Sequence, residues 1–250
     1  MLFSIITAVY NNKNEIQGAI ASVAGQKNVN FEHIIMDGGS NDGTIEAIKE
    51  NSNPYINFES SRDKGIYDAL NKGTLKAKGD IIGILHSDDL FADDKVLRDV
   101  QDMFDSGLDG VYGDLDYVSK NNTTSIFRHW KAFVPDFFQL QLGWMAPHPA
   151  LFLKRSVYEE IGNFDLNYKI SADYDFILRV FLNQKYKIGY LPRTIVKMRV
   201  GGESNRSLKN IIRKSREDLA IASKHFNVPL LTVLFKNFRK IPQFFPRKIN

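Results

Sequence analysis

The first hundred residues alternate four times between a short apolar run and a segment with helical spacing. The runs FSIITAVY, FEHIIMD, INFES and DIIGIL are rich in Ile and Phe, as strands buried in a sheet are. After the first run, apolar residues recur three and four positions apart, at Ile16, Ala19, Ile20 and Val23. This alternation predicts parallel strands joined by right-handed crossovers, and hence an α/β sheet with helices on both faces.

The alternation loosens after about residue 110. GVYGDLDYVS and an aromatic-rich stretch up to Trp144 lead to a predicted strand, PALFLK, and to a predicted helix over residues 174–182. We therefore predict one domain over residues 1–205, divided near residue 110 into two halves, and a separate tail over residues 206–250.

Composition excludes several classes of protein. The chain has no cysteine, which rules out disulfides and thiolate metal sites. No apolar run approaches the roughly 20 residues of a membrane-spanning helix, and the apolar start MLFSIITAVY has neither a basic leader nor a small-residue cleavage site. We expect a cytoplasmic, unprocessed protein.

The positive charge of the chain is concentrated in its tail. Residues 206–250 hold eleven Lys or Arg against two acids, although the whole chain has a net charge of only +4, so residues 1–205 are net acidic. A basic helix over residues 208–225 and the Phe- and Leu-rich segment after it are typical of peripheral binding to an anionic membrane. Packing on the domain and oligomer formation are the alternatives. Nucleic-acid binding fits less well, because the rest of the chain is acidic and lacks a nucleic-acid motif.

Two acidic loops follow predicted strands. DGGSNDGT starts at Asp37, where the second strand ends, and HSDD ends with Asp88 and Asp89 after the fourth strand. Ligands of open α/β sheets bind beyond the carboxyl ends of the strands, so both loops predict a binding site there. Asp37 is suited to accept hydrogen bonds from a nucleobase or a ribose hydroxyl. The alternative is a polar turn in which Ser40 or Asp42 caps the next helix.

Asp88 and Asp89 are adjacent, so their charges repel unless a cation offsets them. Mg²⁺ and Mn²⁺ take oxygen ligands from one or two carboxylates and from substrate phosphates, which predicts a metal-bridged diphosphate. The alternative is that both carboxylates favour the amino end of the next helix.

A third group of acids opens the predicted helix in ISADYDFILRV. On a helix that advances about 100° per residue, Asp173 lies on the apolar face, whereas Asp175 points away from it and is expected to form an exposed pair with Arg179 four positions later. A carboxylate partly enclosed by apolar side chains suits a general base. The alternative is a first-turn acid that the helix dipole favours.

The ordered set of motifs resembles the family 2 glycosyltransferases, which are inverting enzymes of GT-A fold that use nucleotide sugars. The motifs are SIITAVYNN, DGGSNDGT, RDKGIYDALNKGTLKAKGDIIGILHSDD, HPALFLKR, ISADYDFILRV and GGES, and together they cover about residues 1–205. The chain looks most like the subgroup that builds bacterial capsules, exopolysaccharides and lipopolysaccharides. The resemblance implies a nucleotide-binding half up to about residue 110 and an acceptor-binding half over residues 111–205.

The resemblance also implies roles for individual residues. It places Asp37 on the base, Asp88 near the ribose, Asp89 on Mg²⁺ or Mn²⁺, and Asp173 as the catalytic base. The nucleotide-sugar contacts that it implies are Thr7, Val9, Asp37, Asp63 and Asp88. His148 and Trp144 are candidates for the acceptor site, with packing as the alternative for Trp144.

The expected reaction is transfer of a sugar from a nucleoside-diphosphate donor to a hydroxyl of a glycan, such as a lipid-linked one, with inversion at the anomeric carbon. Two other functions remain open on the residues alone. A sugar-phosphate nucleotidyltransferase would share the paired acids but carry a glycine-rich basic loop after the first strand, where this chain has VYNNKNE. A non-catalytic nucleotide-sugar binding protein would have no use for an inward Asp173.

Overall fold

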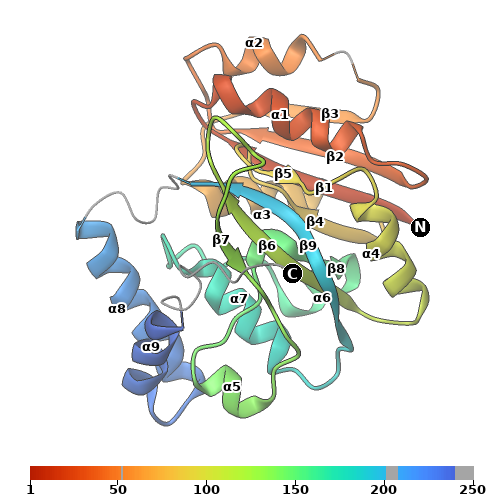
Figure 1. The fold of residues 1–250 in the computed structure, drawn as a ribbon. Helices are drawn as coiled ribbons and strands as arrows, with labels where there is room; N and C mark the ends of the chain where they lie inside the picture. Colours follow the sequence, from red (N-terminus) through yellow and green to blue (C-terminus); the bar gives the residue numbers. More distant parts are fainter. Residues whose placement is uncertain (52, 201–207, 240–250) are drawn as a thin grey trace.

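The computed structural model describes residues 1–51, 53–200 and 208–239. The GGES motif and the end of the basic tail lie outside the described residues. Within the described part, nine strands form one mixed sheet in the order β3-β2-β1-β4-β8-β6-β9-β5, with β7 beside β6 (Figure 1). The prediction of an α/β sheet with helices on both faces and a helical C-terminal tail is confirmed.

The strands are β1 (Leu2–Val9), β2 (Asn30–Asp37), β3 (Ile56–Ser60), β4 (Ile81–Ile84), β5 (Leu90–Phe91), β6 (Gly110–Val118), β7 (Ile126–Trp130), β8 (Leu151–Lys154) and β9 (Ile188–Arg199). The helices are α1 (Lys13–Ala24), α2 (Thr44–Lys49), α3 (Ile66–Lys76), α4 (Val96–Asp105), α5 (Phe137–Gln141), a 3-10 turn η1 (His148–Ala150), α6 (Arg155–Ile161), α7 (Ala172–Phe181), α8 (Leu208–His225) and α9 (Pro229–Phe238).

The first half of the sheet matches the predicted alternation. β1 pairs in parallel with β2 and with β4, and β2 pairs in parallel with β3. Side chains alternate along β1: Phe3 and Ile5 enter a core with α1 and α4, whereas Ile6 and Ala8 enter a second core with α3 and α7. Helices therefore cover both faces of the sheet, as the sequence predicts.

The second half of the sheet contains two long strands that the sequence analysis does not predict. β6 pairs in parallel with β9 and antiparallel with β7 and β8, and β8 joins the two halves by pairing with β4. In β6 the acids Asp114 and Asp116 interrupt the apolar pattern, yet both are buried. Ala132 N and the Tyr190 hydroxyl donate to Asp114, and the His129 ring lies 2.5 Å from Asp116. These partners come from distant segments, so local periodicity does not reveal the strand.

The described part of the basic tail packs on the domain. Ile221, Ala222 and Val233 of α8 and α9 are buried in the same core as α7. A buried ion pair joins Lys236 Nζ of α9 to Asp218 Oδ1 of α8 at 2.7 Å, and the same ammonium lies 3.3 Å from the ring centroid of Tyr174. This arrangement supports the packing alternative for residues 208–238. Across the described residues, no helix combines the length and the apolar composition needed to cross a bilayer.

Candidate active site

The carboxyl ends of β1, β2 and β4 meet at one edge of the sheet. Val9 and Asp37, the last residues of β1 and β2, are register partners, and the loop that carries Asp88 and Asp89 follows β4. The two acidic loops of the sequence are thus brought to the same edge, where ligands of such sheets bind.

Asp37 holds the turn that follows it. Its buried carboxylate accepts hydrogen bonds from the amides of Gly39 and Ser40, both at 3.0 Å, and from the hydroxyls of Ser40 and Ser60. Four hydrogen bonds fix the shape of the turn and join it to β3. The predicted contact between Asp37 and a nucleobase stays a prediction.

Asp63 lies directly against this turn, although it is 26 positions away in the sequence. A Cβ atom on Gly38 would lie 2.5 Å from Asp63 Oδ2, so a larger residue at position 38 would displace this carboxylate. Asp63 Oδ1 accepts a hydrogen bond from the Gly65 amide at 2.8 Å. The structure therefore brings together Asp37 and Asp63, two of the predicted donor-site residues.

Thr7 and Val9 face the interior. The Thr7 hydroxyl donates to Leu85 O at 2.7 Å and lies 2.9 Å from His33 Nε2, which must then donate to it. Burial lowers the pKa of His33 to about 3, so the ring is neutral at pH 7. Thr7 has no exposed surface and Val9 is 3% exposed, so the geometry does not support the predicted nucleotide contacts of their side chains. These residues instead tie β1 to β2 and to the end of β4.

Asp89 is the least satisfied polar group at this edge. Its side chain is fully buried, and neither carboxylate oxygen has a hydrogen-bond partner. Burial raises the pKa of Asp89 well above its usual range, and the nearby charge of Asp88 adds to the rise, whereas Arg199 opposes it. Arg199, the last residue of β9, also donates to Asp88 O at 2.6 Å and so holds the loop in place.

A divalent cation fits the arrangement at Asp89. A buried ionised carboxylate without a partner is costly, and a hard cation with oxygen ligands removes that cost. The described residues contain no cluster of three His, Asp or Glu side chains able to enclose a metal. Asp89, with or without Asp88, would therefore hold the ion by one or two ligands, leaving its other positions to phosphate oxygens and water.

Asp173 lies at the start of α7, within reach of residues from three other segments. The single proton of the Tyr67 hydroxyl of α3 is shared between two acceptors, Ile170 O at 2.7 Å and Asp173 Oδ1 at 3.2 Å. Burial lowers the pKa values of His86 and His148, and the nearby charge of Asp173 opposes this lowering in both. The net pKa of His148 is about 4. Residues of α3, of the segment after β4 and of η1 thus lie around the Asp173 carboxylate.

Tyr117 of β6 connects the two halves of the site. Burial raises the pKa of its hydroxyl, and the charges of Asp89 and Asp173 both add to that rise. Both carboxylates therefore lie within electrostatic range of one phenol. The structure brings the predicted metal ligand and the predicted base to the same region, as a donor sugar placed between them would require.

The two acceptor-site candidates differ in their surroundings. The His148 ring lies 5.4 Å from that of His86, and His148 Nε2 and His86 Nδ1 are buried without hydrogen-bond partners. Trp144 is 4% exposed and packs against Tyr112 and Phe181. The geometry supports a packing role for Trp144, and it leaves His148 next to Asp173 with a polar atom available.

The prediction that Asp175 is exposed is wrong. The predicted pair exists, with Arg179 Nε 2.8 Å from Asp175 Oδ2, but Asp175 is only 4% exposed. Arg179 also donates to Ile161 O and Asn163 O, which precede α7. Almost all of α7 is buried, because α8 and α9 cover the side that the sequence treats as solvent-facing. Asp175 is therefore a structural anchor.

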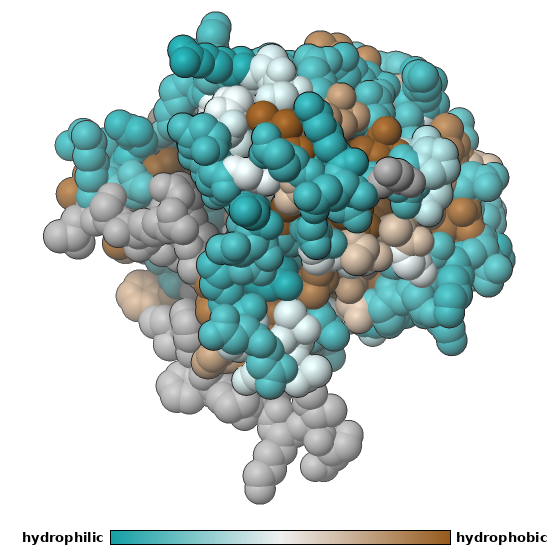
Figure 2. Space-filling view, turned by 90° about the horizontal axis from the view of Figure 1, so that it is seen from above, coloured by the Kyte–Doolittle hydropathy of each residue, from teal (hydrophilic) through white to brown (hydrophobic). Residues whose placement is uncertain are grey.

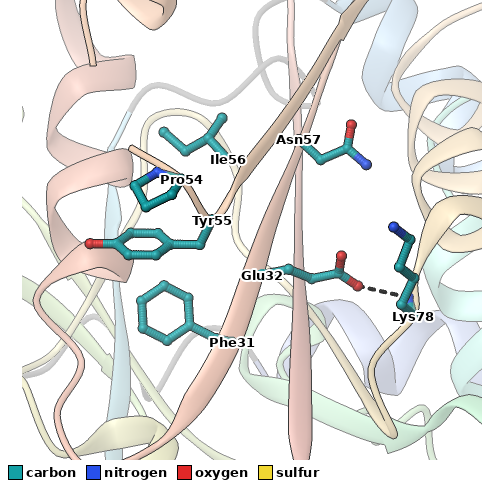
Figure 3. A pocket seen from close by; sticks show the side chains of 7 residues that line it. All are labelled: Phe31, Glu32, Pro54, Tyr55, Ile56, Asn57 and Lys78. Atoms are coloured by element: carbon teal, nitrogen blue, oxygen red, sulfur yellow. Dashed lines mark hydrogen bonds between the residues drawn. The ribbon is translucent and has the colours of Figure 1, made fainter. Parts of the chain in front are cut away.

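A hollow at the opposite edge of the sheet does not belong to this site. It is lined by Phe31, Glu32, Pro54, Tyr55, Ile56, Asn57 and Lys78, at the amino ends of β2 and β3 (Figure 3). The Glu32 carboxylate that points into it already accepts hydrogen bonds from the Lys78 amide and the Ser4 hydroxyl. The Glu32 carboxylate is therefore satisfied within the protein, unlike that of Asp89.

Sequence reasoning missed four residues of the site. Tyr67, Tyr117 and Arg199 come from α3, β6 and β9, and Glu217 comes from α8. Tyr67, Arg199 and Glu217 contact the acidic loops or the Asp173 segment, and Tyr117 lies within electrostatic range of both, each across more than 25 positions of sequence. An Arg at a strand end and a Tyr in a helix are too common to signal a site by themselves.

Known relatives match most of the chain. An uncharacterised glycosyltransferase of Mycobacterium tuberculosis is 31% identical over 190 residues, covering 72% of this chain and 68% of the relative. A PGL/p-HBAD biosynthesis glycosyltransferase of the same species is 29% identical over 246 residues, covering 96% of this chain and 92% of the relative.

Solved structures share the fold. Residues 1–349 of Staphylococcus aureus TarS, in complex with UDP-GlcNAc, superpose with a TM-score of 0.69 at 17% identity, covering 96% of this chain and 73% of that chain. A longer TarS chain is matched over 39% of its length. A mannosyltransferase of Pyrobaculum calidifontis, in complex with GDP-Man and Mn²⁺, has a TM-score of 0.65 at 17% identity, covering 94% of this chain and 68% of that chain.

The family model described as glycosyl transferase family 2 matches residues 4–162, which include both acidic loops and β8. The site residues from Thr7 to His148 lie within that span, whereas Asp173 and Glu217 lie beyond it. This match favours a glycosyltransferase over the nucleotidyltransferase that the residues alone left open. The chain belongs to glycosyl transferase family 2.

Proposed function

We propose that this glycosyltransferase moves a sugar from a nucleoside-diphosphate sugar to an acceptor hydroxyl by a single displacement that inverts the anomeric carbon. The observation that carries the proposal is Asp89, a fully buried carboxylate with no hydrogen-bond partner at the carboxyl end of the sheet. A divalent cation bound to Asp89 and to a donor diphosphate would give this carboxylate the partner that it lacks. Structural neighbours bound to UDP-GlcNAc, and to GDP-Man with Mn²⁺, support this arrangement.

The chain's own residues divide the reaction between Asp173 on one side and the Asp88–Asp89 pair on the other. Asp173 accepts the proton of the attacking acceptor hydroxyl, and Tyr67 orients it through the hydrogen bond to Oδ1. Asp88 and Asp89, anchored by Arg199, hold the diphosphate end of the donor. Asp89 would hold Mg²⁺ or Mn²⁺, which when bound would supply positive charge to offset the charge of the departing diphosphate. His148 stays neutral at pH 7 and is placed to hydrogen-bond an acceptor hydroxyl.

The acceptor that we propose is a glycan, including a lipid-linked glycan, of surface polysaccharide or glycolipid synthesis. Relatives named for PGL/p-HBAD biosynthesis and as a chondroitin synthase of Pasteurella multocida support this class. The test is a screen of UDP- and GDP-sugars for binding by calorimetry and for diphosphate release, with Mn²⁺, Mg²⁺ or chelator. Release from at least one donor is expected only with metal, and no binding of any nucleotide sugar would contradict the proposal.

We also propose peripheral contact with an anionic membrane through α5 and α9. Exposed apolar side chains gather on one side of α9 and on α5, at Leu230, Leu231, Leu234, Phe235, Phe238, Phe137 and Phe138. The two helices are neighbours, because a Cβ atom on Gly143 would lie 2.5 Å from Lys236 Cβ and because Arg239 donates to Leu142 O. By contrast, the face seen in Figure 2 is mostly hydrophilic, with hydrophobic residues in small separate spots.

The membrane proposal predicts a loss of vesicle binding in Leu231→Ser/Phe235→Ser. Each side chain is about half exposed in the protein, and burial of one large apolar side chain contributes about 1.5–3 kcal/mol. The double variant should therefore bind phosphatidylglycerol vesicles at least about tenfold more weakly in flotation assays. Leu75→Ser, at an exposed position of α3, is the matched control. Equal flotation of all three proteins would remove the membrane role.

A further inference from the structure

We infer that Glu217 of α8 is a positioning residue for the reaction, because it holds the segment that carries Asp173. Its carboxylate accepts three consecutive backbone amides: Oε1 accepts that of Lys169 at 3.1 Å, and Oε2 accepts those of Ile170 at 2.8 Å and Ser171 at 3.0 Å. One side chain from the tail thus satisfies three donors immediately before α7. The inference rests on the proposed role of Asp173 as the base.

The N-cap residue of α7 makes no capping bond of its own. Ser171 is at the N-cap position of α7, but its hydroxyl is buried without a hydrogen-bond partner and does not cap the helix. The side chain that anchors the backbone before α7 is instead a carboxylate 46 to 48 positions away in the sequence, which accepts from the amides of residues 169–171. Hydrogen bonds to an ionised carboxylate are among the stronger ones in proteins.

The segment is held from two sides. Glu217 accepts from the Ile170 amide, while the carbonyl of the same residue accepts from the Tyr67 hydroxyl at 2.7 Å. The same hydroxyl donates to Asp173 Oδ1. A shift of residues 169–171 would therefore move both the backbone of Asp173 and the phenol that orients its carboxylate. A misplacement of about 1 Å can cost about 100-fold in rate, so this coupling should appear in turnover.

The tail therefore supports the segment that carries Asp173. The ion pair between Asp218 and Lys236 fixes the next residue of α8, and Lys236 lies on the ring of Tyr174, the residue after Asp173. α8 and α9 therefore reach the first turn of α7 by two contacts, one through Glu217 and one through Lys236. Figure 1 shows both helices on the side of the molecule where α7 lies.

The test compares Glu217→Ala and Glu217→Gln with Ala222→Gly, which loosens α8 at a buried position without touching residues 169–171. Hydrogen exchange on the full chain reports the Lys169, Ile170 and Ser171 amides without any ligand. Glu217→Ala should speed their exchange strongly and Glu217→Gln less, since one neutral oxygen can still accept. With a donor that turns over in the screen, Glu217→Ala should lower kcat about 100-fold with an unchanged donor KM, and added acetate should restore part of the rate.

Unchanged exchange at the three amides in Glu217→Ala would overturn the inference. An equal loss of kcat in Ala222→Gly would also overturn it, because the effect would then be one of helix stability. If the wild-type protein transfers no sugar, the exchange result still decides the role of Glu217 in holding the segment. The absence of transfer would then contradict the proposed function and not the positioning role of Glu217.

Discussion

Asp173→Asn lowers sugar transfer by about 10²–10⁴-fold, the usual contribution of a general base. The amide keeps the size of the carboxylate, and its oxygen can still accept the hydrogen bond from the Tyr67 hydroxyl. It cannot accept the proton of the acceptor hydroxyl. Donor affinity, measured by calorimetry, is expected to stay within a few-fold, because the donor-binding carboxylates belong to other loops. Transfer rate and donor affinity are measured on the same preparations.

Asp175→Asn is the control in the same helix. Because Asp175 is buried and pairs with Arg179, this variant should unfold at a lower denaturant concentration than the wild type. Breaking a buried pair can cost about 3–5 kcal/mol, less here because Arg179 keeps its bonds to Ile161 O and Asn163 O. Under conditions where it is folded, its transfer rate should stay near that of the wild type. Full transfer activity in Asp173→Asn would mean that another group is the base.

Asp89→Asn abolishes metal-dependent binding of the nucleotide. In the wild type, Mn²⁺ should tighten binding of UDP or GDP, and chelator should reverse the effect. The variant should lose about 100-fold or more of that gain, because removal of one partner of a buried charge pair costs about 3–5 kcal/mol. The measurement is titration of each nucleotide with Mn²⁺ and with chelator.

The same substitution should act in the opposite direction on the metal-free protein. Burial and Asp88 destabilise the ionised form of Asp89, and Arg199 offsets only part of this cost. Replacing Asp89 by a neutral amide should therefore raise the melting temperature in chelator. Asp94→Asn, at an exposed position nearby that pairs with Lys27, is the control. An Asp89→Asn protein that keeps metal-dependent binding, or that melts lower than the wild type in chelator, would exclude Asp89 as the metal site.

Local pattern was sufficient for the first half of the fold. The parallel strands β1 to β4 and their helices repeat a short unit in which each strand is apolar and each helix has an apolar face. The carboxyl ends of such strands meet at one edge whatever the rest of the chain does, so the positions of Asp37, Asp88 and Asp89 at one site could be derived from the sequence.

The second half and the tail depended on contacts between distant segments. β6 could not be predicted because its acids are satisfied by His129 and Tyr190, and Asp175 looked exposed because the helices that bury it come later in the chain. Exposure on a helix face depends on what covers that face, and periodicity describes only the helix itself.

The sequence by itself determined the α/β class, the family resemblance and the carboxylates at the carboxyl ends of β2 and β4, because each follows from residue order and spacing. The tertiary structure alone decided that Asp89 is buried without a partner, that Tyr67 lies on Asp173, and that Glu217 of the tail holds residues 169–171. These properties depend on burial and on hydrogen bonds across long sequence separations, and neither quantity exists until the chain has folded.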